Sequence, residues 1–244
     1  VSAHQVECAS PPSSAAGARR LGLSANGQQF AWSGAFFTYR PAAAVSSVWP
    51  VRGASEGGTP VTVLGSGFSS AAEALGALRC RFNSTSVRAA YVSENALVCN
   101  STASRAGMAS VEVSTNGREY TASGVQFEQV SYSVAGLAPR LGPVLGGTVV
   151  TIAGSRLAGA SEALQCRFGG SAGSGIGSSS LLSSASAHGP DGVRCVSPPA
   201  LPTGWASVEL LVHGTTLRSG SSLYVHPALH TSALVPQLGR CLAG

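Results

Sequence analysis

Short runs in which apolar and polar residues alternate recur along the chain, and this two-residue period predicts β-strands. Residues 60–64 and 149–153 are apolar at every second position and are followed by a glycine. In 78–82 and 164–168, apolar side chains and a cysteine share one face while polar side chains take the other. Further strands are predicted at 87–92, 96–99, 110–114 and 207–211, and a last strand in each half of the chain is predicted to end near Phe127 and Tyr224.

Helical periodicity is confined to residues 70–78, which are predicted to form a single turn. Many short strands separated by glycine- and proline-rich turns are typical of an antiparallel sandwich, so the predicted fold class is all-β. Residues 169–187 are rich in glycine and serine, and burial there would not offset the entropy of ordering. We predict a surface insertion at this place, with a partner-contacting or O-glycosylated loop as the alternative.

One stretch of eleven residues occurs three times, beginning at Val48, Leu137 and Leu234. The copies share a proline and two glycines at the same places and start 89 and 97 residues apart. That spacing exceeds the roughly 20–50 residues of a solenoid repeat and matches a whole small domain.

Two further markers fall in the same register. A cysteine lies 40–42 residues before each repeated proline, and a His-Gly or Asn-Gly pair follows each cysteine by 17 or 18 residues. Such a pair between strands predicts a two-residue hairpin turn, because both turn residues need positive φ. The cysteines are Cys8, Cys99 and Cys195, and the turns are Asn26-Gly27, Asn116-Gly117 and His213-Gly214.

The repeats predict tandem β-sandwiches with defined boundaries. Residues 1–41 correspond to the C-terminal half of a domain, 42–130 and 131–227 to complete domains, and 228–244 to the start of a further one.

Composition narrows the range of partners. Charged residues make up 10% of the chain, every basic residue is arginine, and the formal net charge of +5 is thinly spread. Nucleic-acid binding needs clustered cations, and no basic run is longer than Arg19-Arg20, so nucleic acid is not a predicted partner. No apolar stretch reaches the roughly 18 residues of a membrane span, so no membrane segment is predicted within this sequence.

The six cysteines favour an oxidising compartment. A pair recurs inside each complete domain, and we predict one disulfide between Cys80 and Cys99 and another between Cys166 and Cys195. Buried free thiols are the alternative. Cys8 is expected to have no partner within its own half-domain, and the partner of Cys241 stays open.

Two sites match the acceptor sequence for N-glycosylation, Asn83-Ser84-Thr85 and Asn100-Ser101-Thr102. Both asparagines are expected to lie on the exposed surface. Asn100 follows a cysteine that faces the core, so strand alternation points its side chain outward.

Together these motifs resemble the IPT/TIG family, the immunoglobulin-like domains of plexins, Met-type receptors and fibrocystin. The first complete domain carries the pattern as Pro50, Gly57-Gly58-Thr59, Gly65-Ser-Gly67-Phe68, Cys80-Arg-Phe82 and Cys99. The second carries it as Pro139, Gly146-Gly147-Thr148, Cys166-Arg-Phe168 and Cys195-Val-Ser-Pro-Pro199, with Gly154-Ser-Arg-Leu157 as a departure. The resemblance implies tandem immunoglobulin-like sandwiches and does not by itself specify a function.

No arrangement of residues indicates catalysis. Asp191 is the single aspartate, the five histidines lack metal-ligand spacing, and the cysteines are interpreted as structural. We therefore predict no enzyme activity, no metal and no cofactor. Trp49 precedes a domain start and is interpreted as an interdomain contact, and Trp205 is interpreted as a core residue.

These features favour a non-catalytic structural or adhesive extracellular protein whose domains form a rod or filament on the cell or ciliary surface. A mastigoneme-like flagellar hair is one version. The expected partners are copies of the chain, other fibre or surface components, and glycans. The alternatives are the stalk of a plexin- or fibrocystin-like receptor, accessory domains of a secreted carbohydrate-active enzyme, and an intracellular DNA-binding protein with a TIG dimerisation domain.

Overall fold

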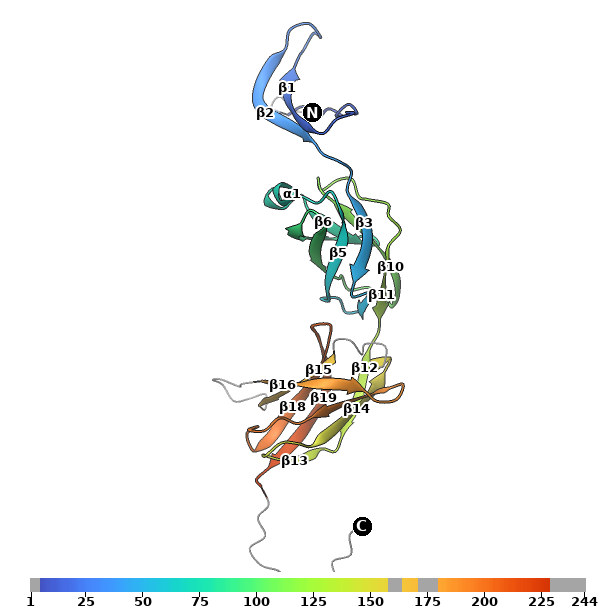
Figure 1. The fold of residues 1–244 in the computed structure, drawn as a ribbon, viewed down its shortest axis with the longest axis vertical. Helices are drawn as coiled ribbons and strands as arrows, with labels where there is room; N and C mark the ends of the chain where they lie inside the picture. The colour runs from blue at the N-terminus through green and yellow to red at the C-terminus, as the bar shows by residue number, and fades with distance from the viewer. Residues whose placement is uncertain (1–4, 158–163, 171–179, 229–244) are drawn as a thin grey trace, which may run out of the picture.

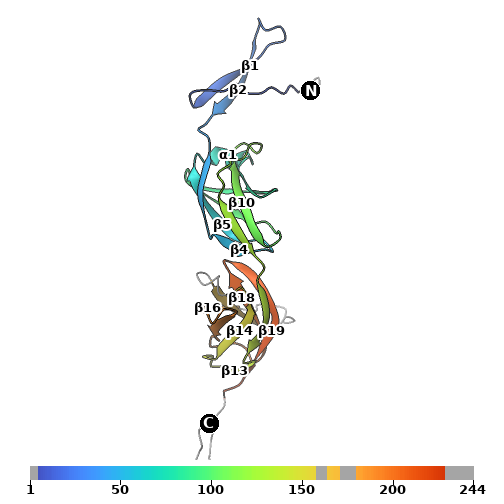
Figure 2. The ribbon, with the colours of Figure 1, turned by 90° about the vertical axis from the view of Figure 1, so that its right-hand side faces the viewer.

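The molecule is a row of three β-structured units in the computed structural model, which describes residues 5–157, 164–170 and 180–228. Two views at right angles show an N-terminal hairpin, a first sandwich and a second sandwich following one another along the long axis (Figures 1 and 2). We call residues 42–130 domain 1 and residues 131–227 domain 2. The predicted start of a further domain at 228–244, with Cys241, lies almost entirely outside the described residues.

The N-terminal hairpin consists of β1 (Gly17–Leu23) and β2 (Ala31–Tyr39), which pair antiparallel. Its connecting loop repeats that of domain 1. The hydroxyl of Ser24 accepts a hydrogen bond from the amide of Gly27 at 2.8 Å, as the hydroxyl of Ser114 does from Gly117 at 2.9 Å. The hairpin is therefore built like the last hairpin of a complete domain.

Domain 1 packs two sheets face to face. The first has the order β3-β5-β9-β8 and the second β4-β11-β10-β6-β7. Its strands are β3 (Ala44–Trp49), β4 (Arg52–Ala54), β5 (Pro60–Ser66), β6 (Arg79–Phe82), β7 (Thr85–Arg88), β8 (Ala90–Ser93), β9 (Ala96–Asn100), β10 (Gly107–Ser114) and β11 (Gln126–Val130). The single helix α1 (Ser70–Ala74) is capped by the Ser69 side chain, which accepts from the amide of Ala72.

Domain 2 arranges its strands in one continuous series, β12-β14-β17-β16-β15-β18-β19-β13. The strands are β12 (Ser133–Ala138), β13 (Leu141–Pro143), β14 (Val149–Ser155), β15 (Leu164–Gly170), β16 (Leu181–Ala187), β17 (Gly192–Val196), β18 (Gly204–Val212) and β19 (Thr215–His226). The predicted surface insertion at 169–187 is wrong at both ends, because β15 extends to Gly170 and 181–187 forms a strand, while 171–179 lie outside the described residues.

Alternation along the strands produces both cores. Val61 and Val63 in β5, and Val150 and Ile152 in β14, are almost completely buried, while the residues between them face outward. Phe127 and Phe168 are the largest side chains with essentially no exposure, one in each domain. Trp205 contradicts its predicted core position, because Ala206, Val208 and Leu210 take the buried side of β18 and leave Trp205 56% exposed.

The Gly-Gly-Thr motif builds the same turn in both domains. Gly57 and Gly58 have φ of 79°, and Gly146 and Gly147 have φ of 75° and 81°, a region that side chains with a Cβ rarely adopt. The turn brings the amide of the following threonine onto a serine hydroxyl, Thr59 onto Ser101 at 3.1 Å and Thr148 onto Ser197 at 3.0 Å.

The predicted two-residue hairpin turn occurs at one of the three expected places. His213 and Gly214 both have positive φ, and Val212 pairs directly with Thr215. At the two Asn-Gly pairs the loops are longer. There the asparagine Oδ1 accepts amides two and three residues ahead, which closes an Asx turn in place of a tight hairpin.

Candidate functional site: the junction between the domains

The two domains meet with almost no linker. Strand β11 ends at Val130 and β12 begins at Ser133, so the polypeptide passes directly from one sandwich into the next. Ala54, Val130 and Tyr132 belong to the buried apolar cluster of domain 2, with exposed fractions of 0%, 4% and 6%. Ala54 and Val130 of domain 1 therefore complete the core of domain 2, together with Tyr132 just after the boundary.

The tip of the β18–β19 hairpin reaches back onto domain 1. The hydroxyl oxygens of Thr59 and Thr215 lie 3.1 Å apart and form a hydrogen bond between the domains. Thr59 is itself fully buried, and its hydroxyl also accepts the amide of Ala54 at 3.3 Å. Gly214, at the turn, faces Pro60.

Trp49 contacts the partner domain, as its place before Pro50 predicts. Its ring lies edge-on to that of His213, with centroids 6.5 Å apart and planes 85° apart. Trp49 is 56% exposed, so it flanks the junction and does not fill it. Thr59, Thr215 and Tyr132 are junction residues that local sequence patterns do not predict, although Thr59 stands in the repeated Gly-Gly-Thr motif.

The Tyr132 side chain leaves a polar group unsatisfied at the junction. Its hydroxyl is buried and has no hydrogen-bond partner among the described residues. Burial raises the pKa of Tyr132, an effect that the Arg52 charge opposes and the Glu128 charge reinforces. Arg52 and Glu128 form a partly exposed ion pair at 3.3 Å on neighbouring strands.

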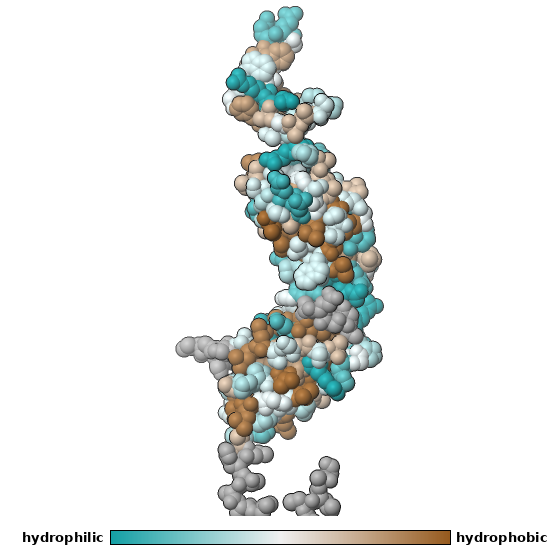
Figure 3. Space-filling model, in the orientation of Figure 1, coloured by the Kyte–Doolittle hydropathy of each residue, from teal (hydrophilic) through white to brown (hydrophobic). Residues whose placement is uncertain are grey.

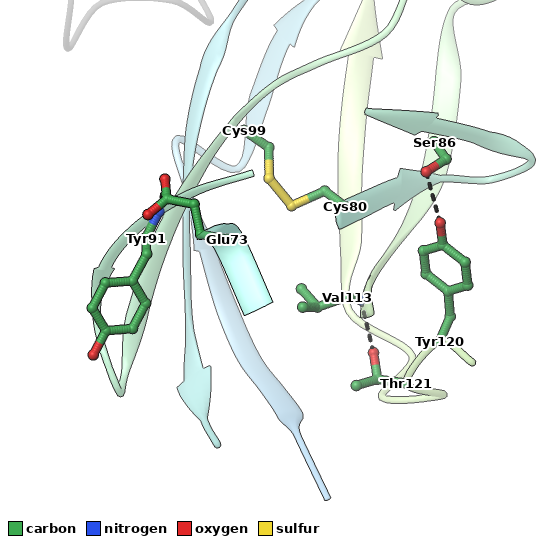
Figure 4. The surroundings of a disulfide bond; sticks show 8 residues. All are labelled: Glu73, Cys80, Ser86, Tyr91, Cys99, Val113, Tyr120 and Thr121. Atoms are coloured by element: carbon green, nitrogen blue, oxygen red, sulfur yellow. Dashed lines mark hydrogen bonds between the residues drawn. A yellow bond between two sulfur atoms is a disulfide. The ribbon is translucent and has the colours of Figure 1, made fainter. Parts of the chain in front are cut away.

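Each domain carries one disulfide between its cysteine pair. Cys80 in β6 is bonded to Cys99 in β9, with Cα atoms 6.4 Å apart, and this bond joins the two sheets of domain 1 (Figure 4). Cys166 in β15 is bonded to Cys195 in β17, with Cα atoms 6.2 Å apart. All four are buried. Cys8 is exposed and forms no disulfide with any described residue.

Both candidate glycosylation sites lie on domain 1. Asn83 is exposed in the β6–β7 turn with φ of 52°, and its Oδ1 accepts the amide of Ser110 at 3.0 Å. Asn100 is exposed at the end of β9, where it pairs with Pro60. Domain 2 contains no asparagine.

The described residues hold little that resembles a catalytic centre. A cleft of about 650 Å³ lies between the N-terminal hairpin and domain 1, and of its lining residues only Arg40 and Glu119 are charged. In the described part of the chain, no three His, Cys, Asp or Glu side chains are grouped so as to hold a metal ion. Among the described helices, none has the length and apolarity needed to cross a membrane.

Comparison with known proteins agrees with this architecture. A family model described as IPT/TIG domain matches residues 43–129 and 133–226. No curated protein sequence matches the chain.

Two solved structures of the plexin A4 extracellular region are similar. One has a TM-score of 0.59 at 16% identity, covering 88% of this chain and 19% of the plexin chain. The other has a TM-score of 0.50 at 19% identity, covering 76% and 18%. The chain thus spans about a fifth of the plexin chains that it resembles.

Proposed function

Because the chain belongs to the IPT/TIG family, we propose that it serves as a non-catalytic extracellular rod whose stiffness comes from the junction between its domains. IPT/TIG domains are non-catalytic immunoglobulin-like modules. The observation that carries the proposal is the burial of Ala54 and Val130, which belong to domain 1, in the core of domain 2 beside Tyr132. A flexible linker would leave such side chains exposed.

Further contacts at the junction restrict both bending and twisting. The Thr59–Thr215 hydrogen bond and the Trp49–His213 contact lie on the hairpin tip, away from the β11–β12 connection. Two attachments at separate places prevent rotation that a single covalent connection would allow. The role that follows is to hold surfaces apart or to assemble side by side into a filament on a cell or ciliary surface.

The extracellular part of the proposal is supported by one disulfide in each domain and by two exposed glycan acceptors. Disulfides persist in oxidising compartments. We expect N-glycosidase treatment of the native protein to lower its mass by one or two glycans, and Asn83→Gln and Asn100→Gln to assign them. An unchanged mass, together with reduced cysteines, would favour an intracellular role.

The rod is tested by residual dipolar couplings of the full chain, which report the orientation and mobility of each domain. A rigid junction gives domains 1 and 2 the same alignment tensor. A matched control with a Gly-Ser-Gly-Ser insertion between Val130 and Ser131 should give two different tensors. Different tensors in the unaltered protein would reject the rod and favour independent domains on a flexible stalk.

A further inference from the structure

One row of side chains on the outer face of domain 2 is apolar where the fold does not require it. Leu141, Tyr224 and Trp205 lie directly opposite one another on the neighbouring strands β13, β19 and β18. Their exposed fractions are 60%, 37% and 56%, and the two aromatic rings meet edge to face with centroids 5.3 Å apart. Figure 1 shows these strands side by side in the lower domain.

Domain 1 has two charged residues and one methionine at the same positions, and we call these three its polar row. Arg52, Glu128 and Met108 pair with one another across β4, β11 and β10 as the apolar three do in domain 2. Arg52 and Glu128 form an ion pair there, and Met108 is 63% exposed. The fold therefore accepts charged side chains at two of these three positions and a solvated side chain at the third, so packing does not require the two aromatic rings and the leucine of domain 2.

A following domain that docked as domain 2 docks on domain 1 would leave the Trp205 end of the aromatic row accessible. Domain 2 sits on Ala54, Val130, Thr59 and Trp49 and leaves Met108 exposed. Trp205 holds the place of Met108, so its ring would stay accessible. Apolar side chains also reach the surface elsewhere on both domains (Figure 3).

Polar groups continue this outer face along β18. Ser207 and Ser222 form the next pair, and Gly169 lies opposite Ser207 on β15. These three residues are small, so the sheet surface beside the aromatic rings lies lower than the rings themselves. Beyond it Glu209 is held between two arginines. Arg167 donates to it at 2.8 Å through Nε, and Arg218 lies 3.7 Å from it.

We propose that this face, defined by Trp205, Tyr224, Leu141, Ser207 and Glu209, binds a pyranose oligosaccharide. The C–H groups on the face of a sugar ring pack against the electron-rich face of an aromatic ring. Hydroxyl, carboxylate and guanidinium groups then bond the sugar hydroxyls. Trp205 and Glu209 are four residues apart on one strand, about 13 Å, which is the length of two to three sugar units.

The size of the apolar row favours a sugar over a protein. The three side chains expose on the order of 300 Å², whereas a standard protein interface takes about 800 Å² from each partner, of which roughly 450 Å² is apolar. A sugar ring needs only one or two aromatic faces. This activity goes beyond the proposed rod and does not depend on it.

The test uses the full chain and immobilised hexasaccharides of β-linked glucose, galactose, mannose and N-acetylglucosamine, followed by titration calorimetry on any sugar bound. We expect at least one to bind, and Trp205→Ala to weaken it about tenfold or more. Tyr224→Ala should weaken it less, and Trp205→Phe should retain most of it. Met108→Ala is the matched control and should bind like the unaltered protein.

A second arm transfers the row to domain 1 by combining Arg52→Leu, Met108→Trp and Glu128→Tyr in the Trp205→Ala background. Partial return of binding would support the proposal. Trp205 faces outward, so its variants should fold normally. Unchanged melting temperatures will show that they do. The proposal is overturned if no hexasaccharide binds the unaltered protein, if Trp205→Ala binds equally well, or if Trp205→Ala abolishes self-association without affecting sugar binding.

Discussion

Domains 1 and 2 follow one topology but differ in the strand that runs between their two sheets. In domain 1 this strand is broken at Ala89, which is buried and donates its amide to Leu78, and the halves β7 and β8 join different sheets. In domain 2 the unbroken β16 pairs with β15 through residues 181–184 and with β17 through residues 185–187. One local break thus decides between two separate sheets and one continuous series.

The largest expected effect that tests this comparison is the loss of a disulfide. Cys80→Ala with Cys99→Ala, and Cys166→Ala with Cys195→Ala, open loops with separations of 19 and 29 residues. Each pair of changes should cost its domain about 3 kcal/mol, and domain 2 should lose about 0.4 kcal/mol more, because the longer loop gains more entropy when opened. Calorimetric unfolding of both variants measures the difference. Equal losses, or a larger loss in domain 1, would contradict this expectation and would mean that the continuous sheet of domain 2 offsets the larger entropy of its opened loop.

The junction makes the stability of domain 2 depend on domain 1. Replacing Tyr132 by Phe removes a buried hydroxyl that has no partner in the described part of the chain, so it should stabilise domain 2 by about 1 kcal/mol. Chemical denaturation at neutral pH measures this gain. A loss of stability would show that the hydroxyl is satisfied in solution.

Alkaline pH gives an independent check on Tyr132. Burial raises the pKa of this residue in the folded state. The stability associated with the protonated hydroxyl is therefore fully present below the ordinary tyrosine pKa of about 10, and it is lost as the pH rises through the folded value. Stability should therefore fall less steeply above about pH 10 in Tyr132→Phe than in the unaltered chain. If stability falls with pH at the same slope in both proteins, the pKa of Tyr132 is not raised by folding.

A smaller effect is expected where the glycine motif departs from its pattern. Gly67 has φ of 76°, and domain 2 has Arg156 with φ of 63° at the matching place. Arg156→Gly should stabilise domain 2 by about 1 kcal/mol or slightly less, since glycine adopts this conformation without the Cβ penalty. The matched change Gly67→Ala should destabilise domain 1. Thermal melts of the two variants should shift in opposite directions.

The smallest effect concerns the polar row of domain 1. Glu128→Gln removes the partner of Arg52, and the pair is more than a third exposed on both sides. The cost should be about 0.5 kcal/mol and should shrink as salt is added. A loss of several kcal/mol would show that this row is structural, which would weaken the comparison with the aromatic row of domain 2.

The strands, the domain order and the repeat register could be predicted from local patterns. Alternation in β5 and β14 reflects one buried face, and the Gly-Gly pairs reflect a turn that needs positive φ, so both signals are present in the residues themselves. The family also follows from such motifs. These features depend on neighbours in sequence, which is why they can be read without the fold.

The exposure of Trp205 and the junction contacts of Thr59 and Thr215 could not be predicted from the sequence, because they depend on contacts between distant residues. Trp205 differs from a core position by one step of register, and that step is set by how β18 pairs with β15 and β19. Thr59 and Thr215 are 156 residues apart and meet only because the domains stack. The sequence by itself determined which domains form and in what order. Only the tertiary structure decided which faces meet and which remain open, because that depends on strand pairing and docking across the whole chain.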